Sequence, residues 1–190
     1  MTPSGHLRAD AERNVRSIID AAIVLLATEP DASMERVATA AGVGRATVYR
    51  HFASREQLVR AIVDRALQDA RDAVIGSRPE DGTALEALTR AVESLMRVAD
   101  RYRLVMAISP HDVELRRRVD EVRVPLQAII ERGQEEGVVR RDLPARWGTS
   151  ALGALLQAVT VEIIDGAVAE SQAVPLIVDT LVDGLRPHDA

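Results

Sequence analysis

Apolar residues recur at intervals of three and four along nearly the whole chain, and this spacing constrains the fold more than any other feature. Between Asp10 and Thr28 they make a single stripe of Val15, Ile18, Ile19, Ala22, Leu25 and Leu26. Such a stripe lies along one face of an α-helix and is the face that packs into a core. No stretch alternates apolar and polar residues for long with the period of two that a half-buried strand needs. The sequence therefore predicts an all-α protein with about nine helices.

The predicted helices are separated by helix-breaking and loop-forming residues. They cover about 10–28, 33–41, 45–51, 54–75, 83–100, a shorter piece to 108, 112–136, 144–165 and 171–185. Asp10 is a residue type that caps helix N-termini, and Pro30 forces an end to the first helix. Pro125 is expected to kink or split the helix that contains it, because proline removes an intrahelical hydrogen bond.

Composition and motif searches argue against several function classes. The chain has 190 residues and no cysteine, so it contains no disulfide, thiolate nucleophile or cysteine metal site. Its four histidines are far apart, and no HExxH, glycine-rich phosphate loop or GxSxG motif occurs. We therefore expect no catalytic residues, no metal, no cofactor and no enzyme activity. The longest apolar run, residues 21–27, is too short to span a bilayer, and no signal-peptide core is present. These features predict a cytoplasmic protein without a membrane partner.

Residues 33–52 have the anatomy of a helix-turn-helix. Two short predicted helices meet at a turn containing Gly42, which can take the positive φ that ends the first helix. The residues expected to face the core are Val37, Ala38 and Ala41 on the first helix and Val48 and Phe52 on the second. The second helix of such a motif presents its N-terminal part to base edges in the DNA major groove.

The segment 37–58, VATAAGVGRATVYRHFASREQL, is similar to the TetR family of transcriptional regulators. The resemblance implies a three-helix DNA-binding domain, residues 1–53, followed by a larger helical domain for ligand binding and dimerisation, residues 54–190, with helix 54–75 connecting the two. Most members are repressors that a small molecule releases from DNA. We therefore expect a ligand-responsive regulator, a repressor on a palindromic double-stranded DNA operator. The alternative is a helical scaffold protein that binds DNA or a small molecule without regulating transcription.

The resemblance also implies which residues of the second helix contact DNA. Thr47 and Tyr49 stand where family members contact the DNA backbone, and His51 is a further phosphate candidate. Arg45 and Arg50 occupy variable positions that often read bases. A guanidinium can form two hydrogen bonds with guanine, which is the chemical reason for assigning base reading to these two positions. Tyr49 as a core aromatic and His51 as a packing or capping residue remain alternatives.

Three further positions complete the predicted DNA-binding set. Arg55 stands where the family usually has a lysine that contacts phosphate, although it could instead pair with Glu56 or Asp64 on a solvated face. Ser33 matches a hydroxyl position at the start of the helix before the turn. Ala46 replaces a common glycine, which is expected to shift base preference.

The distribution of charge agrees with a DNA-binding N-terminal part. The whole chain carries a net charge of −5. Residues 1–66 hold nine arginines against eight acids, or +1, and the remainder holds 15 against 21, or −6. Within residues 33–60 five arginines face two glutamates, which gives +3. The acidity therefore lies outside the helix-turn-helix.

The C-terminal two-thirds is expected to bind a small-molecule effector and a second copy of the chain. Candidate ligand residues are Met96, Tyr102, Met106, Trp147, Leu156, Gln157 and Thr160, with ordinary core packing as the alternative for each. Helices 144–165 and 171–185 carry apolar residues on more than one face, so each needs two partners. The family resemblance implies that the second partner is the same pair of helices in another copy of the chain. The two pairs together form a four-helix bundle, which makes a homodimer.

Overall fold

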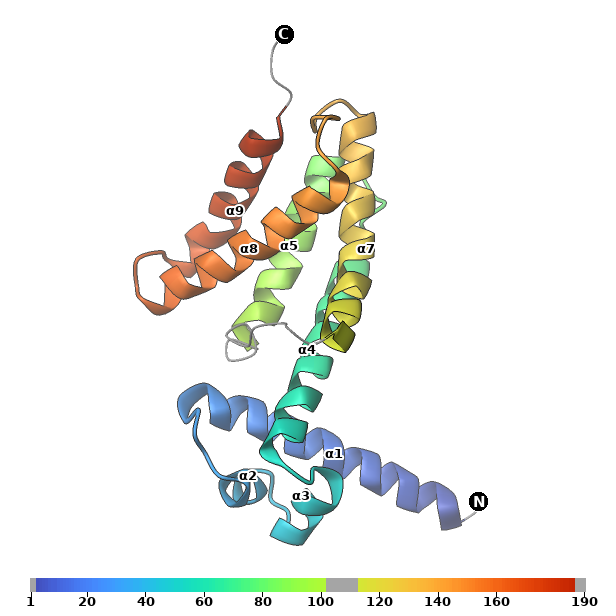
Figure 1. Cartoon of the computed structure of the whole chain (residues 1–190), viewed down its shortest axis with the longest axis vertical. Helices are drawn as coiled ribbons and strands as arrows, with labels where there is room; N and C mark the ends of the chain where they lie inside the picture. Colours follow the sequence, from blue (N-terminus) through green and yellow to red (C-terminus); the bar gives the residue numbers. More distant parts are fainter. Residues whose placement is uncertain (1–2, 102–112, 187–190) are drawn as a thin grey trace. The chain divides into compact units, whose positions relative to one another are not determined.

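The structure, a computed structural model, describes residues 3–101 and 113–186 (Figure 1). These residues form eight α-helices and no strand. The helices are α1 (Pro3–Thr28), α2 (Met34–Ala40), α3 (Arg45–His51), α4 (Arg55–Gly76), α5 (Ala84–Arg101), α7 (Val113–Glu135), α8 (Ala145–Ile164) and α9 (Glu170–Leu185). The prediction of an all-α fold is confirmed. The short predicted piece between 100 and 108, the sixth in chain order, lies outside the described residues apart from Arg101.

Two helices differ from their predicted course. α1 begins at Pro3 and runs through Asp10, which is therefore not its N-cap. Proline is tolerated in the first turn of a helix, because the N–H that it lacks has no intrahelical acceptor there. α7 continues through Pro125, so this proline does not split the helix. Leu126, Ile129 and Ile130 are buried on the turns that follow, and this burial offsets the missing hydrogen bond.

The chain forms two compact units, and the division between them falls inside α4. The first unit comprises α1, α2, α3 and α4 as far as Ala66, together with Arg101. The second comprises α4 from Leu67, the rest of α5, and α7 to α9. The domain boundary that the sequence places at residue 53 stays a prediction.

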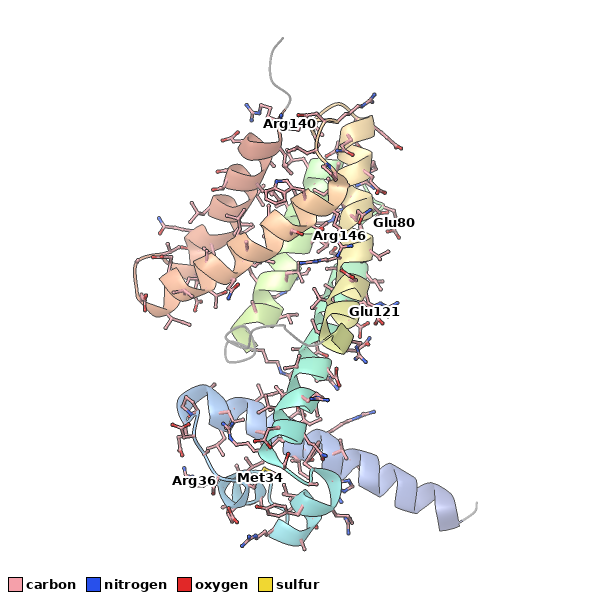
Figure 2. All side chains as sticks on the ribbon, viewed as in Figure 1. Met34, Arg36, Glu80, Glu121, Arg140 and Arg146 are labelled. Carbon is pink, nitrogen blue, oxygen red and sulfur yellow. The ribbon has the colours of Figure 1, made fainter. Side chains whose placement is uncertain are left out.

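The core of the first unit is built from the apolar stripe of each of its helices. Its buried residues include Ile18, Ala22 and Leu26 of α1, Met34, Val37 and Ala38 of α2, Val48 of α3, and Leu58 and Ile62 of α4. Met34 and Arg36 lie on the same short helix, with Met34 buried and Arg36 exposed (Figure 2). The arrangement fixes α3 against the unit by one face and leaves its other face outside.

The core of the second unit brings together α4, α5, α7, α8 and α9. Its buried residues include Val74, Leu88, Val92, Ile129, Ile130, Leu152 and Ile177. α8 packs against both α7 and α9. At the surface an Arg146 Nη2 to Asp120 Oδ1 contact of 3.3 Å joins α8 to α7 (Figure 2). Within the described residues, α8 is the one helix long and apolar enough to cross a membrane, a property that core helices share.

Candidate nucleic-acid interface

The turn between α2 and α3 depends on Gly42. Its φ is +67°, and its N–H donates to the Thr39 carbonyl at 3.1 Å. The next N–H, that of Val43, reaches back to the Ala38 carbonyl at 3.0 Å. This pair of hydrogen bonds is a Schellman motif, which ends α2 and satisfies two of its free carbonyls. The predicted role of Gly42 is confirmed.

α3 has one buried face and one exposed face, which is the geometry a recognition helix needs. Val48 and the residue after the helix, Phe52, are buried, as predicted. Arg45, Ala46 and Arg50 are exposed, and Tyr49 is 39% exposed, so the tyrosine is not a core residue. Thr47 and His51 are half-buried at the edges of the exposed face. The arginines that the sequence assigns to base reading therefore share the outer side of one helix.

Arg45 is held by two neighbours. Its Nη2 lies 3.0 Å from Glu35 Oε1 on α2, and its guanidinium lies 5.3 Å from the centroid of the Tyr49 ring. The pKa of Glu35 is lowered, chiefly because its own backbone N–H donates to the carboxylate. The Ser33 hydroxyl donates a further hydrogen bond, and the Arg45 charge adds to the effect. Glu35 is thus a carboxylate at the predicted interface that the sequence analysis did not single out.

Ser33 caps the N-terminus of α2. Its Oγ accepts a hydrogen bond from the Arg36 N–H at 3.3 Å, while its backbone is extended. A hydroxyl at this position therefore has a structural function in the free protein, because it satisfies one of the N–H groups without an intrahelical acceptor. Ser33 is also exposed, so the same group remains accessible to a phosphate.

The start of α4 is tied to the loop between α1 and α2. The Arg55 guanidinium donates a hydrogen bond to the Pro30 carbonyl, a contact that could not be predicted from the sequence. Beside it, the Gln57 N–H donates to Ser54 Oγ at 3.3 Å, and the Ala53 N–H donates to Gln57 Oε1 at 3.0 Å. These bonds place Arg55, half-buried, at the first turn of the helix that follows the recognition helix.

His51 differs from the other predicted phosphate contacts. Its Nε2 is buried, and among the described residues this atom has no hydrogen-bond partner. The predicted phosphate contact of His51 stays a prediction.

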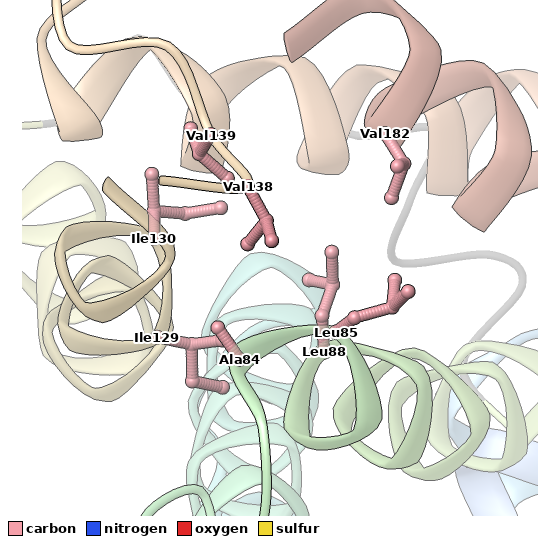
Figure 3. A pocket seen from close by; sticks show the side chains of 8 residues that line it. All are labelled: Ala84, Leu85, Leu88, Ile129, Ile130, Val138, Val139 and Val182. Carbon is pink, nitrogen blue, oxygen red and sulfur yellow. The ribbon is translucent and has the colours of Figure 1, made fainter. Parts of the chain in front are cut away.

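The second unit contains an apolar pocket between α5, α7, the segment after α7, and α9 (Figure 3). Its cavity volume is about 40 Å³, it is partly open to solvent, and it is lined by Ala84, Leu85, Leu88, Ile129, Ile130, Val138, Val139 and Val182. None of the predicted ligand residues that the structure describes lines it. Its lining is entirely aliphatic, and such positions have the same sequence pattern as ordinary core positions. This is why the residues that line the pocket could not be predicted from the sequence.

The predicted ligand residues occupy several different environments. Met96 and Leu156 are partly buried against the core, and Thr160 is buried with its Oγ1 donating to the Leu156 carbonyl at 2.7 Å. Trp147 is 60% exposed, and Gln157 is exposed. Tyr102 and Met106 lie outside the described residues. In the part of the chain that is described, no group of three His, Asp or Glu side chains could hold a metal ion.

α8 and α9 leave large apolar side chains in solvent. The exposed set is Trp147, Val161 and Ile164 on α8 and Leu176 on α9. Large apolar side chains exposed on two neighbouring helices make α8 and α9 a candidate surface for a partner.

Comparison with known proteins agrees with this architecture. Residues 18–62 match the family model described as bacterial regulatory proteins, tetR family. The chain is 32% identical to the HTH-type transcriptional repressor LfrR of Mycolicibacterium smegmatis over 177 residues, 92% of this chain and 91% of the relative. It is 30% identical to the HTH-type transcriptional regulator NfxB of Pseudomonas aeruginosa over 135 residues, 67% of this chain and 71% of the relative. The crystal structure of LfrR in complex with proflavine, from Mycobacterium smegmatis, has a TM-score of 0.76 at 29% identity, covering 93% of this chain and 99% of that one.

A helix-turn-helix with an exposed, arginine-bearing second helix, joined to a larger helical unit, defines a DNA-binding regulator of transcription. The chain belongs to the TetR family of bacterial regulatory proteins. The family resemblance stated from residues 37–58 is thereby confirmed. Regulators of this family bind operator DNA and small ligands, form dimers, and in general are not enzymes.

Proposed function

We propose that this protein is a homodimeric repressor that binds a palindromic operator through α3 and leaves it when a small molecule binds the second unit. The observation that carries the proposal is the two-sided α3, anchored by Val48 and exposing Arg45 and Arg50. The relative LfrR is named a repressor and has been crystallised with proflavine, which supports repression and ligand control. The protein acts in the cytoplasm, where its DNA target lies, and does so without catalysis.

Within this proposal the residues of the interface divide by chemistry. Arg45 and Arg50 read base edges, because a guanidinium offers two parallel donors to guanine. Thr47, Tyr49 and His51 contact phosphates and set the position of the helix in the groove. Ser33 and Arg55 contact phosphates on either side of α3, and the Ala46 methyl group lies on the outer side of the recognition helix.

The dimer forms through α8 and α9, whose exposed apolar residues then lie between two copies. This also accounts for the high apolar content of α8, because a helix packed by its own protomer on one face and by the partner on another has few places for charge. A two-fold axis here gives two recognition helices, and a spacing of about 34–36 Å between them would fit successive major-groove faces of a palindrome.

The effector binds in the second unit, at the residues predicted from the sequence. The pocket between α5, α7 and α9 is a second candidate region, favoured by its wholly aliphatic lining. Pockets for small ligands are mostly apolar, but they usually also contain a few polar groups that fix orientation. The pocket as lined here suits a small aliphatic group.

The test is a reporter gene placed behind the DNA that lies directly upstream of the protein's own coding sequence. We expect expression to fall when the protein is present, and a footprint of two related half-sites. Binding to that DNA without any change in expression would support the scaffold alternative instead. The absence of any DNA binding would contradict the proposal.

A further inference from the structure

Glu35 is the only carboxylate between Ser33 and Ser54, the segment that contains the whole helix-turn-helix. It shares that segment with Arg36, Arg45 and Arg50. A carboxylate at a surface that approaches phosphates is unfavourable, because like charges repel across the interface. The position of Glu35 at this surface therefore needs an explanation other than electrostatic attraction to DNA.

The geometry of Glu35 connects it to one arginine in particular. Its Oε1 lies 3.0 Å from Arg45 Nη2, and the two residues come from different helices of the motif. Both side chains are about half exposed or more, so solvent screens the pair and it contributes little to stability. The Tyr49 ring, 5.3 Å from the guanidinium, lies on the same outer side of α3 and keeps Arg45 close to the helix. The pair therefore orients an exposed side chain and does little to hold the fold.

From this geometry we infer that Glu35 competes with DNA for Arg45 and so limits the affinity of the protein for its operator. The inference rests on the proposed DNA-binding function. On an arbitrary sequence, a single solvent-screened phosphate contact does not outweigh the loss of the ion pair, so Arg45 stays with Glu35. At a suitably placed guanine, the bidentate hydrogen bonds of Arg45 replace the ion pair. The operator complex therefore bears the cost of breaking the ion pair, whereas binding to arbitrary DNA does not, so Glu35 lowers the affinity for the operator more than the affinity for arbitrary DNA.

The variant that tests this inference is Glu35→Gln, which keeps the size of the side chain and removes its charge. The probes are two duplexes: one selected from a random library by binding to the wild-type protein, and one with the same bases shuffled. We expect the ratio of the affinity for the selected duplex to that for the shuffled duplex to rise on the order of threefold, mostly through tighter binding of the selected duplex. The salt dependence for the shuffled duplex should steepen by about one phosphate contact, since Arg45 becomes free to bind one.

Glu29→Gln is the matched control. Glu29 pairs with Arg36 at the surface of the same unit, so this variant also removes one charge from an exposed ion pair. It leaves Arg45 untouched, and we expect the affinity ratio to stay at the wild-type value. An equal change in both variants would mean that only net charge matters and would overturn the inference.

A double-mutant cycle with Arg45→Ala tests whether the effect of Glu35→Gln on the affinity ratio depends on Arg45. In the Arg45→Ala background, Glu35→Gln should leave the affinity ratio unchanged, because the residue through which Glu35 acts is gone. A ratio that still changes there, or one that does not change in Glu35→Gln alone, would overturn the inference. Thermal unfolding of each variant checks that the fold is intact. If the wild-type protein selects no sequence from the library, the proposed function itself fails, which is a separate result.

Discussion

Gly42 is the residue on which the path from α2 to α3 depends most directly. It has a φ of +67°, and a methyl group built on its Cα would meet nothing within 4 Å. The obstacle to any other residue is therefore conformational and not steric crowding. A left-handed backbone costs an ordinary L-residue about 1–2 kcal/mol.

We predict that Gly42→Ala lowers the free energy of unfolding by about 1–2 kcal/mol, measured by chemical denaturation. Gly44→Ser is the control, because Gly44 has a φ of −71°, open space around it and the N-cap position of α3. Serine is a favoured N-cap, so this variant should be as stable as the wild type or more stable. A similar loss in both variants would show that the turn tolerates no substitution, whatever the sign of φ.

Arg50 is predicted to read one base, and Tyr49 to contact a phosphate. Arg50→Ala should therefore weaken operator binding by about 1–3 kcal/mol and relax the preference at one base pair. Tyr49→Phe should weaken binding to operator and shuffled DNA alike, since a phosphate contact carries no sequence information. The two variants are compared by titrating duplexes that carry each base at every operator position. An equal loss on all duplexes for Arg50→Ala would contradict its base-reading role.

At the scale of single residues, the sequence predicted what depends on local chain geometry. Gly42, Val48 and Phe52 followed from the turn and from helical spacing, and the structure places them as expected. The partners of Arg45 and Arg55 did not follow, because a long side chain selects its partner from whatever the tertiary fold brings near. The Pro30 carbonyl that Arg55 contacts is 25 residues away in sequence. Every residue has a backbone carbonyl, so the sequence does not show which one will accept the hydrogen bond.

Among the helices, α5 begins with a reciprocal capping arrangement. The Thr83 N–H donates to Glu86 Oε2 at 2.9 Å, and the Glu86 N–H donates to Thr83 Oγ1 at 3.3 Å. From outside the helix, Glu136 Oε2 accepts from the Ala84 N–H at 3.0 Å. Three N–H groups at one end of α5 are thereby satisfied by side chains.

We predict a pH-dependent contribution of Glu86 to stability. Its pKa is lowered, chiefly because the Thr83 backbone N–H and hydroxyl donate to the carboxylate. A carboxyl group with a lowered pKa in the folded state stabilises the fold above its ordinary pKa of about 4.3, and this stabilisation is lost as the pH falls through the lower, folded-state value. Glu86→Gln should therefore flatten the dependence of stability on pH between about 5 and 3. Glu93→Gln, at an exposed site on the same helix, is the control, and an equal flattening there would contradict the prediction.

The helices themselves were predictable because their apolar spacing is strong and because glycine or proline residues mark most of the loops between them. Predicted ranges for α4, α8 and α9 agree with the structure to within one residue at each end. The start of α1 was wrong, since an N-cap residue type such as Asp10 is also acceptable inside a helix. A split at Pro125 was wrong as well, because burial of the following turns outweighs the local cost of a proline. At Pro125, packing overrode a local signal.

For the molecule as a whole, we predict a dimer at micromolar concentration that depends on α8. Ile164 is 58% exposed at the end of this helix. Ile164→Glu should raise the dimer dissociation constant by about tenfold or more, because an unpaired carboxylate is costly to bury. Sedimentation velocity across a concentration series measures it. Val124→Glu, at a 67% exposed site on α7, is the control and should leave association unchanged. A wild-type protein that stays monomeric would contradict the proposed interface.

The fold class and the position of the DNA-binding segment could be predicted from the sequence, whereas the pocket could not. A helix-turn-helix is contained in about twenty consecutive residues, so its pattern can be recognised directly in the sequence. The pocket lining comes from α5, α7, residues 138 and 139, and α9, which meet only after folding. Aliphatic residues on four separate segments are indistinguishable from core until their positions in space are known.

The exposed apolar residues of α8 and α9 have a consequence for the steady-state abundance of this regulator in the cell. If pairing covers Trp147, Ile164 and Leu176, then newly made chains remain vulnerable until they meet a partner. Association stabilises a fold by mass action, so the surviving fraction rises with the rate of synthesis. Chains made too slowly are degraded by quality-control proteases before they pair, whereas chains made quickly persist. The abundance of such a repressor would respond more steeply than linearly to its own expression, which gives the gene it controls a threshold.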